Sequence, residues 1–113
     1  MRKINLAITG CMGRMGKHII KSARSDKNFK IVTLTENRII KKSINGIKPS
    51  LNNAEAFKKA NLIIDFSVPK CTLEVLKISS KLKKKVEIGK KLKDRSLNFF
   101  LVHKTNLYQF KNL

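Results

Sequence analysis

Three glycines spaced three residues apart follow an apolar segment near the start of the chain. Gly10, Gly13 and Gly16 come directly after residues 4–9, whose sequence is INLAIT. Glycine lets the backbone turn tightly beside phosphate oxygens, and the N-terminus of a following helix presents unpaired N–H groups to them. A strand, a glycine-rich turn and a helix in this order are typical of proteins that hold a dinucleotide pyrophosphate. Because the commoner spacing is G-x-G-x-x-G, further support must come from the rest of the chain.

A carboxylate follows the next predicted strand at the distance that a dinucleotide site needs. Residues 30–35 are rich in β-branched side chains, which favours a strand, and Glu36 comes directly after them. An acidic group roughly twenty residues beyond the glycine turn accepts ribose hydroxyls, whereas an arginine nearby accommodates the 2′-phosphate of NADP. Arg38 stands two residues after Glu36, so both NAD and NADP remain open as the cofactor.

A third polar segment follows the apolar residues 62–64. Asp65, Phe66 and Ser67 stand at the carboxyl end of this predicted strand, the edge at which ligands bind in open α/β sheets. Ser67 caps the helix that begins near Pro69, or its backbone lines a cofactor cleft, and the two roles are compatible.

The elements that position these residues alternate along the chain. We expect strands at 4–9, 30–35, 62–66 and 86–89, and helices at 13–25, at 54–60 and from Pro69 to the lysines at 83–85. This alternation favours an α/β fold with a doubly wound parallel sheet. On the first helix, Met15, Ile19 and Ala23 share one face, and Asn53 is expected to cap the helix at 54–60. The apolar run at 98–102 has no predicted partner in the sheet.

Charge dominates the composition, with 26 Lys and Arg against 7 Asp and Glu and a net charge of +19. Such an excess is typical of nucleic-acid or anionic-surface partners, but a bias toward Lys, Asn and Ile across the chain also produces it. The lysines are dispersed, and one tyrosine with no tryptophan offers little for base stacking, so a nucleic-acid partner is disfavoured.

The remaining composition predicts a small cytoplasmic protein without a membrane span. No apolar run has the length of such a span, and residues 1–3 lead into the first strand without a signal peptide. Cys11 and Cys71 do not suggest a disulfide framework, and we expect neither a metal site nor catalytic residues in this chain.

Taken together, these segments resemble one family of reductases. The runs GCMGRMG at 10–16, LIIDFSVPKCTL at 62–73 and VEIG at 86–89, with Glu36 between them, resemble the N-terminal domain of 4-hydroxy-tetrahydrodipicolinate reductase (dihydrodipicolinate reductase). The resemblance implies a Rossmann domain that binds NAD(P)H. In the family, an α+β domain follows that binds substrate and forms a tetramer. The implied activity is reduction of 4-hydroxy-tetrahydrodipicolinate in lysine and diaminopimelate biosynthesis.

The resemblance also implies which residues contact the cofactor. The glycine turn would hold the pyrophosphate, the segment after the second strand would take the adenosine ribose, and the segment after the third would border the nicotinamide. The positions are Gly10, Cys11, Met12, Gly13, Arg14, Met15, Glu36, Asn37, Arg38, Phe66, Ser67 and Gly89, the last beginning a further cofactor turn.

The sequence departs from the family pattern at its end. The family has Thr-Thr-Gly after the position of Gly89, where this chain has KKL at 90–92. Glu87 falls in a strand that should be buried, where an unpaired carboxylate is costly. The paired-histidine proton donor and the Lys…Pro-Ser-Gly-Thr substrate loop have no counterpart, so His18 and His103 are expected on the surface without a catalytic role.

We therefore predict a partial Rossmann fold, with a dinucleotide-binding domain at 1–89, an unmatched basic tail at 90–113, and no substrate domain or tetramer interface. The leading hypothesis is a truncated reductase that binds the dinucleotide weakly and turns over little or no substrate alone. A non-catalytic, frameshifted remnant and a basic nucleic-acid-binding module are the alternatives, and another Rossmann oxidoreductase is disfavoured. Reading the downstream nucleotide sequence in all frames tests the remnant, and a salt-dependent gel shift tests the basic module.

Overall fold

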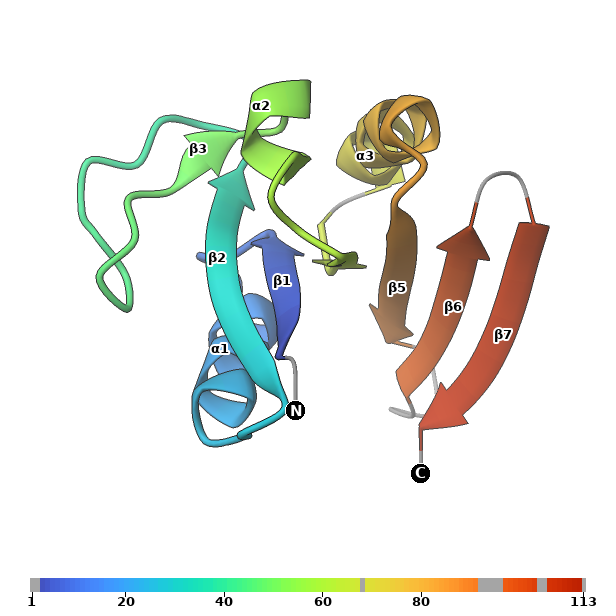
Figure 1. Cartoon of the computed structure of the whole chain (residues 1–113), viewed down its shortest axis with the longest axis horizontal. Coiled ribbons are helices and arrows are strands. Elements are labelled where there is room, and N and C mark those ends of the chain that lie inside the picture. Colours follow the sequence, from blue (N-terminus) through green and yellow to red (C-terminus); the bar gives the residue numbers. More distant parts are fainter. Residues whose placement is uncertain (1–2, 68, 92–96, 104–105, 113) are drawn as a thin grey trace.

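One sheet runs through the protein, and helices lie against it (Figure 1). The computed structural model describes residues 3–67, 69–91, 97–103 and 106–112. The elements in chain order are β1 (Ile4–Thr9), α1 (Arg14–Arg24), β2 (Phe29–Glu36), β3 (Ser50–Leu51), α2 (Ala54–Phe57), β4 (Leu62–Asp65), α3 (Pro69–Leu82), β5 (Lys85–Lys91), β6 (Leu97–His103) and β7 (Asn106–Asn112).

The strand order is β3-β2-β1-β4-β5-β6-β7. Pairing is parallel from β3 to β5, and β6 and β7 then add an antiparallel hairpin. The predicted doubly wound parallel α/β sheet is confirmed for the first five strands. The apolar run at 98–102 lies within β6, which pairs with β5. The domain boundary after residue 89 stays a prediction, since the described strands beyond it continue the same sheet.

Both faces of the parallel strands are covered. Leu6 and Ile8 of β1 pack with Ile20 of α1, whereas Ala7, between them in sequence, packs on the other face with Val75 of α3. Alternate side chains of a strand point to opposite faces, so a strand buried on both faces reads as a continuous apolar run. The continuous apolar run at residues 6–8 therefore follows from the central position of β1.

The buried face of helix α1 overlaps the predicted one at Ala23 but is rotated from it. Its buried residues are Gly16, Ile20 and Ala23, while Met15 and Ile19 are only partly buried. Hydrophobic periodicity gives no weight to a glycine, but Gly16 is buried because its backbone lies against the preceding glycine turn. The buried residues Gly16 and Ile20 thus each stand one position after the predicted Met15 and Ile19, while Ala23 is buried as predicted.

Helix α2 is a single turn, shorter than the predicted helix at 54–60. The Asn53 side chain accepts a hydrogen bond from the Ala56 N–H at 2.8 Å, so the predicted cap is confirmed. In β5, Glu87 is half-buried and lies beside Ile64 of β4. Burial raises the pKa of the Glu87 carboxyl above its ordinary value, in agreement with the expected cost of this position. Across the described ranges, no helix has the length and apolar character needed to span a membrane.

Candidate dinucleotide-binding site

The winding direction of the sheet reverses between β1 and β4. From β1 the chain moves outward to β2 and β3, and it then returns to place β4 and β5 on the other side. In open α/β sheets, ligands bind outside the carboxyl ends of the strands at such a reversal. The glycine turn follows β1 here, and the segment Phe66–Ser67 follows β4. The fold thus brings two of the predicted cofactor segments to one edge of the sheet.

Gly10 is in direct contact with the turn after β4. Its φ is +64°, and a Cβ built there would lie 3.2 Å from the Phe66 carbonyl oxygen and 3.3 Å from the Ser67 Cα. A side chain is therefore disfavoured by the backbone conformation and by the space available. This contact sets the distance between the glycine turn after β1 and the turn after β4.

The N-terminus of helix α1 carries no side-chain cap. Gly13 is the N-cap residue with extended backbone angles, no side chain makes a cap hydrogen bond there, and the first turn holds no acidic residue. The first N–H groups of a helix lack intrahelical partners and carry partial positive charge. Arg14 and Met15 form the start of this turn, and the exposed Arg14 adds a full charge beside it. The arrangement suits a phosphate or pyrophosphate group.

Glu36 ties the end of β2 to the glycine turn. One carboxylate oxygen accepts a hydrogen bond from the Met12 N–H at 3.0 Å, and the other accepts one from the Asn37 N–H at 3.0 Å. The Cys11 N–H also donates to the Thr35 carbonyl at 3.2 Å. The structure therefore places Glu36 against the glycine turn. A ribose contact at Glu36 stays a prediction. Asn37 lies beside it and is exposed, as is Arg38, the next residue.

Cys11 is fully buried behind this turn. Burial raises the pKa of its thiol from 9.0 to about 11, and the Glu36 charge acts in the same direction. The protonated thiol is favoured in the folded state, so its contribution to stability is present at neutral pH and is lost as the pH rises from 9 toward 11. Cys11 is accordingly a packing residue of the turn at neutral pH, since nucleophilic attack requires the thiolate.

We expect Cys11 to resist alkylation in the folded protein. The rise in pKa from 9.0 to about 11 alone leaves about 100-fold less thiolate at neutral pH, and burial blocks access as well. Iodoacetamide labelling followed by mass spectrometry should modify Cys11 only in denaturant. A cysteine introduced by Ser80→Cys on the exposed side of α3 serves as a reactive control. Labelling of Cys11 at the rate of that control would contradict the buried placement.

The sequence places Asp65 at the end of a strand but does not reveal that its carboxylate is buried beneath the two turns. Asp65, the last residue of β4, is fully buried and accepts hydrogen bonds from three hydroxyl groups. Thr9 Oγ1 and Ser67 Oγ donate to Oδ1, Thr72 Oγ1 donates to Oδ2, and the Ser67 N–H donates to Oδ1 at 3.2 Å. Ser67 therefore directs its hydroxyl to Asp65.

A sequence signal for this network does exist. Thr9 and Asp65 are register partners at the ends of neighbouring parallel strands. Each is the polar residue that ends an otherwise apolar strand segment, and both are buried. Two polar residues that are opposite each other in a buried region must satisfy one another's hydrogen bonds. The hydrogen bonds of Asp65 therefore connect Thr9 at the end of β1 with Thr72 in the first turns of α3.

The predicted turn at Gly89 is wrong. Strand β5 continues to Lys91, and Gly89 pairs with Phe99 of β6. The strand replaces the turn because backbone pairing with β6 continues through and beyond this residue. A cofactor contact at Gly89 stays a prediction. His18 is exposed on α1, and the side chain of His103 lies outside the described residues. Where side chains are described, no three of His, Cys, Asp and Glu cluster as metal ligands.

A doubly wound sheet with a glycine turn and a helix N-terminus at its point of reversal defines a Rossmann-like α/β domain. Residues 4–90 match the family described as "Dihydrodipicolinate reductase, N-terminus". The chain belongs to this family, as its motifs predict.

The curated relatives agree with this assignment. Over 89 residues, the chain is 61% identical to the 4-hydroxy-tetrahydrodipicolinate reductase of Pelagibacter ubique (strain HTCC1062), an alignment that covers 79% of this chain and 34% of the relative. The chain spans about a third of the length of the curated relatives it matches.

Two solved structures share the fold at low sequence identity. A dipicolinate-bound dihydrodipicolinate reductase from Paenisporosarcina sp. TG-14 has a TM-score of 0.65 and 18% identity, covering 82% of this chain and 40% of that one. An aspartate semialdehyde dehydrogenase with NADP from Candida albicans has a TM-score of 0.66 and 12% identity. This match covers 79% of this chain and 30% of that one.

Proposed function

We propose that this chain binds NADH or NADPH as the cofactor half of a 4-hydroxy-tetrahydrodipicolinate reductase. The uncapped N-terminus of α1 at the reversal of the sheet is the observation that carries the proposal. It offers N–H groups and partial positive charge to the pyrophosphate at the edge where such ligands bind. Gly13, the N-cap residue, carries no side chain that could occupy these N–H groups.

The residues of the site fit the parts of a dinucleotide. The turn from Gly10 to Met15 would hold the pyrophosphate, and Glu36 would accept ribose hydroxyls of the adenosine. Phe66 and Ser67 would border the nicotinamide, because their backbone lies against Gly10 in the glycine turn. Glu36 is already held as a hydrogen-bond acceptor by two N–H groups, which supports NAD. The exposed Arg38 nearby keeps NADP as the other candidate.

The reaction of the complete family members would follow from this placement. The reduced nicotinamide supplies the hydride, and the protein orients it and excludes competing reactions. The residues on the cofactor side are those that this chain contributes. Substrate binding, protonation and tetramer assembly are assigned to the part of the relatives that the chain does not span. Weak cofactor binding and little or no turnover by this chain alone are therefore expected.

The substitution Gly13→Asp tests the proposal. Aspartate is a favoured N-cap residue, and its carboxylate would occupy the N–H groups that we assign to the pyrophosphate. A titration followed by NADH fluorescence should show saturable binding to the unchanged chain and roughly tenfold or more weaker binding to the variant. Thermal unfolding should show that the variant remains folded.

A matched control separates the site from the overall charge. Ser80→Asp adds the same negative charge on the exposed side of α3, away from the glycine turn. It should leave NADH affinity within about twofold of the original value, because an exposed charge is strongly screened at that distance. If the unchanged chain shows no saturable NADH binding up to millimolar cofactor, the proposal is wrong.

A further inference from the structure

A groove beside helix α1 has the composition of a second anion site. It has a volume of about 450 Å³ and is lined by Met12, Lys17, Ile20, Lys21, Arg24, Lys42, Ser43 and Ile44, which we call the α1 groove. We propose that the α1 groove binds a nucleoside triphosphate or a closely similar small molecule, with its phosphates among the cations and its ring on the apolar residues. This site is separate from the pyrophosphate position at the helix N-terminus.

The charges of the α1 groove are all of one sign. Lys17, Lys21 and Arg24 lie three and four residues apart on α1, and Lys42 faces them from the loop after β2. No acidic residue lines the groove, and α1 itself contains none. Like charges at this spacing repel one another on a helix. A polyanion between them would relieve the repulsion.

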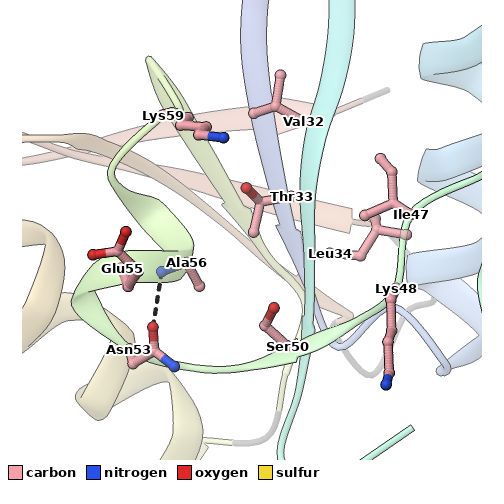
Figure 2. Close-up of a pocket in the computed structure, with 10 residues that line it drawn as sticks. All are labelled: Val32, Thr33, Leu34, Ile47, Lys48, Ser50, Asn53, Glu55, Ala56 and Lys59. Atoms are coloured by element: carbon pink, nitrogen blue, oxygen red, sulfur yellow. Dashed lines mark hydrogen bonds between the residues drawn. The ribbon is translucent and has the colours of Figure 1, made fainter. Parts of the chain in front are cut away.

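Comparison with a second pocket shows that a lysine-rich chain does not give every pocket a purely cationic lining. The edge pocket in Figure 2 has a volume of about 360 Å³ and lies between β2 and the segment that carries β3 and α2. Its charged lining residues are Lys48, Lys59 and Glu55, and the two lysines stand on opposite sides of it. The edge pocket therefore mixes both signs, whereas the α1 groove concentrates four cations.

The apolar lining of the α1 groove is fixed by the core. Ile20 is buried in the cluster beneath α1, and Met12 and Ile44 pack against that cluster while remaining partly exposed. A planar ring can lie on such a surface without displacing charged groups. Pockets that bind small molecules typically combine an apolar surface with a few placed polar groups, at volumes of about 300–1,000 Å³.

The spacing of the cations favours several phosphates over one. Lys17 and Arg24 are separated by about 10 Å along the axis, given the helical rise of about 1.5 Å per residue. A single phosphate reaches the cations at one end of this span only, while a triphosphate extends along it. Met12 belongs to the glycine turn and also lines the α1 groove, so the two sites are neighbours. Their cations differ, since Arg14 stands at the helix N-terminus and the cations of the groove come from later turns of α1 and from Lys42.

Titration of adenosine triphosphate into the full chain by calorimetry, at physiological ionic strength, tests this inference. The double variant Lys21→Gln/Arg24→Gln should weaken binding at least tenfold. The double variant Lys48→Gln/Lys59→Gln removes the same charge from the edge pocket and should stay within twofold. Inorganic tripolyphosphate should bind the unchanged chain several-fold more weakly than the nucleotide, because it lacks a ring to cover the apolar residues.

The Gly13→Asp variant distinguishes this site from the proposed cofactor site. It should lose NADH affinity while it keeps the affinity for adenosine triphosphate. Loss of both ligands would overturn the inference by placing the triphosphate at the helix N-terminus. Equal weakening in the two double variants, or the absence of saturable binding to folded protein, would also overturn it. A single-stranded oligonucleotide that binds more tightly than the triphosphate, with the same dependence on Lys21 and Arg24, would reassign the groove to nucleic acid.

Discussion

Replacing Gly16 with alanine is expected to destabilise the protein by about 3 kcal/mol or more. A Cβ at this position would lie 2.2 Å from the Gly10 carbonyl oxygen and 2.9 Å from the Cys11 Cα. Both obstacles are backbone atoms of the glycine turn, so no side-chain rotation removes the clash. Helix α1 would have to move away from the turn, which separates Ile20 from its core cluster. Denaturant unfolding monitored by circular dichroism measures the loss.

Gly46→Ala is the appropriate control for this prediction. Gly46 has a φ of +74°, and no atom lies within 4 Å of the position that a Cβ would take, so alanine there brings only the cost of the left-handed conformation. That cost is about 1 kcal/mol. The difference between the two variants measures the close approach at Gly16. A Gly16→Ala protein as stable as Gly46→Ala would show that α1 and the turn do not meet as described.

The order of elements was predictable because it depends on local patterns. The largely apolar run at residues 4–9, the β-branched run ending before Glu36 and the apolar residues 62–64 each lie in a parallel strand. The hairpin of β6 and β7 was not predicted, since antiparallel pairing with β5 depends on contacts that periodicity in one segment does not reveal. For the same reason, the turn predicted at Gly89 is replaced by continued pairing.

The location of the candidate site in the fold was predictable where a local sequence motif implies a particular backbone geometry. The glycine turn lies against Phe66 and Glu36 lies beside Met12, so the segments that the motifs single out meet at one edge of the sheet. Their contacts with a cofactor stay predictions. The supporting residues were less visible. Gly16 was counted as part of the motif but not as the residue that lets α1 touch the turn. Asp65 was noted only for its place at the strand end, because its partners come from different elements and its burial depends on tertiary structure.

Asp65→Asn is expected to cost about 2 kcal/mol of stability and to weaken NADH binding as well. An ionised carboxylate only accepts hydrogen bonds, and the groups around Asp65 include three hydroxyl donors and the Ser67 N–H. An amide keeps one oxygen and presents two donor hydrogens to this shell, so at least one hydroxyl must reverse its role. The charge-assisted character of the remaining bonds is lost at the same time. Denaturant unfolding gives the stability, and the fluorescence titration gives the affinity under conditions where the variant is folded.

Asp26→Asn supplies the matched comparison, because it makes the same chemical change in the polar turn after α1. Asp26 accepts one hydrogen bond from the Asn28 N–H at 2.9 Å and is partly exposed, so the expected cost is about 0.5 kcal/mol. The net charge of the protein changes equally in both variants. A difference between them in stability or NADH affinity therefore cannot come from the net charge. The loss of NADH affinity in Asp65→Asn should exceed that in Asp26→Asn, because Asp65 holds the Ser67 turn that meets Gly10. Equal effects of the two substitutions on stability and affinity would mean that the Asp65 network does not position the Ser67 turn against the glycine turn.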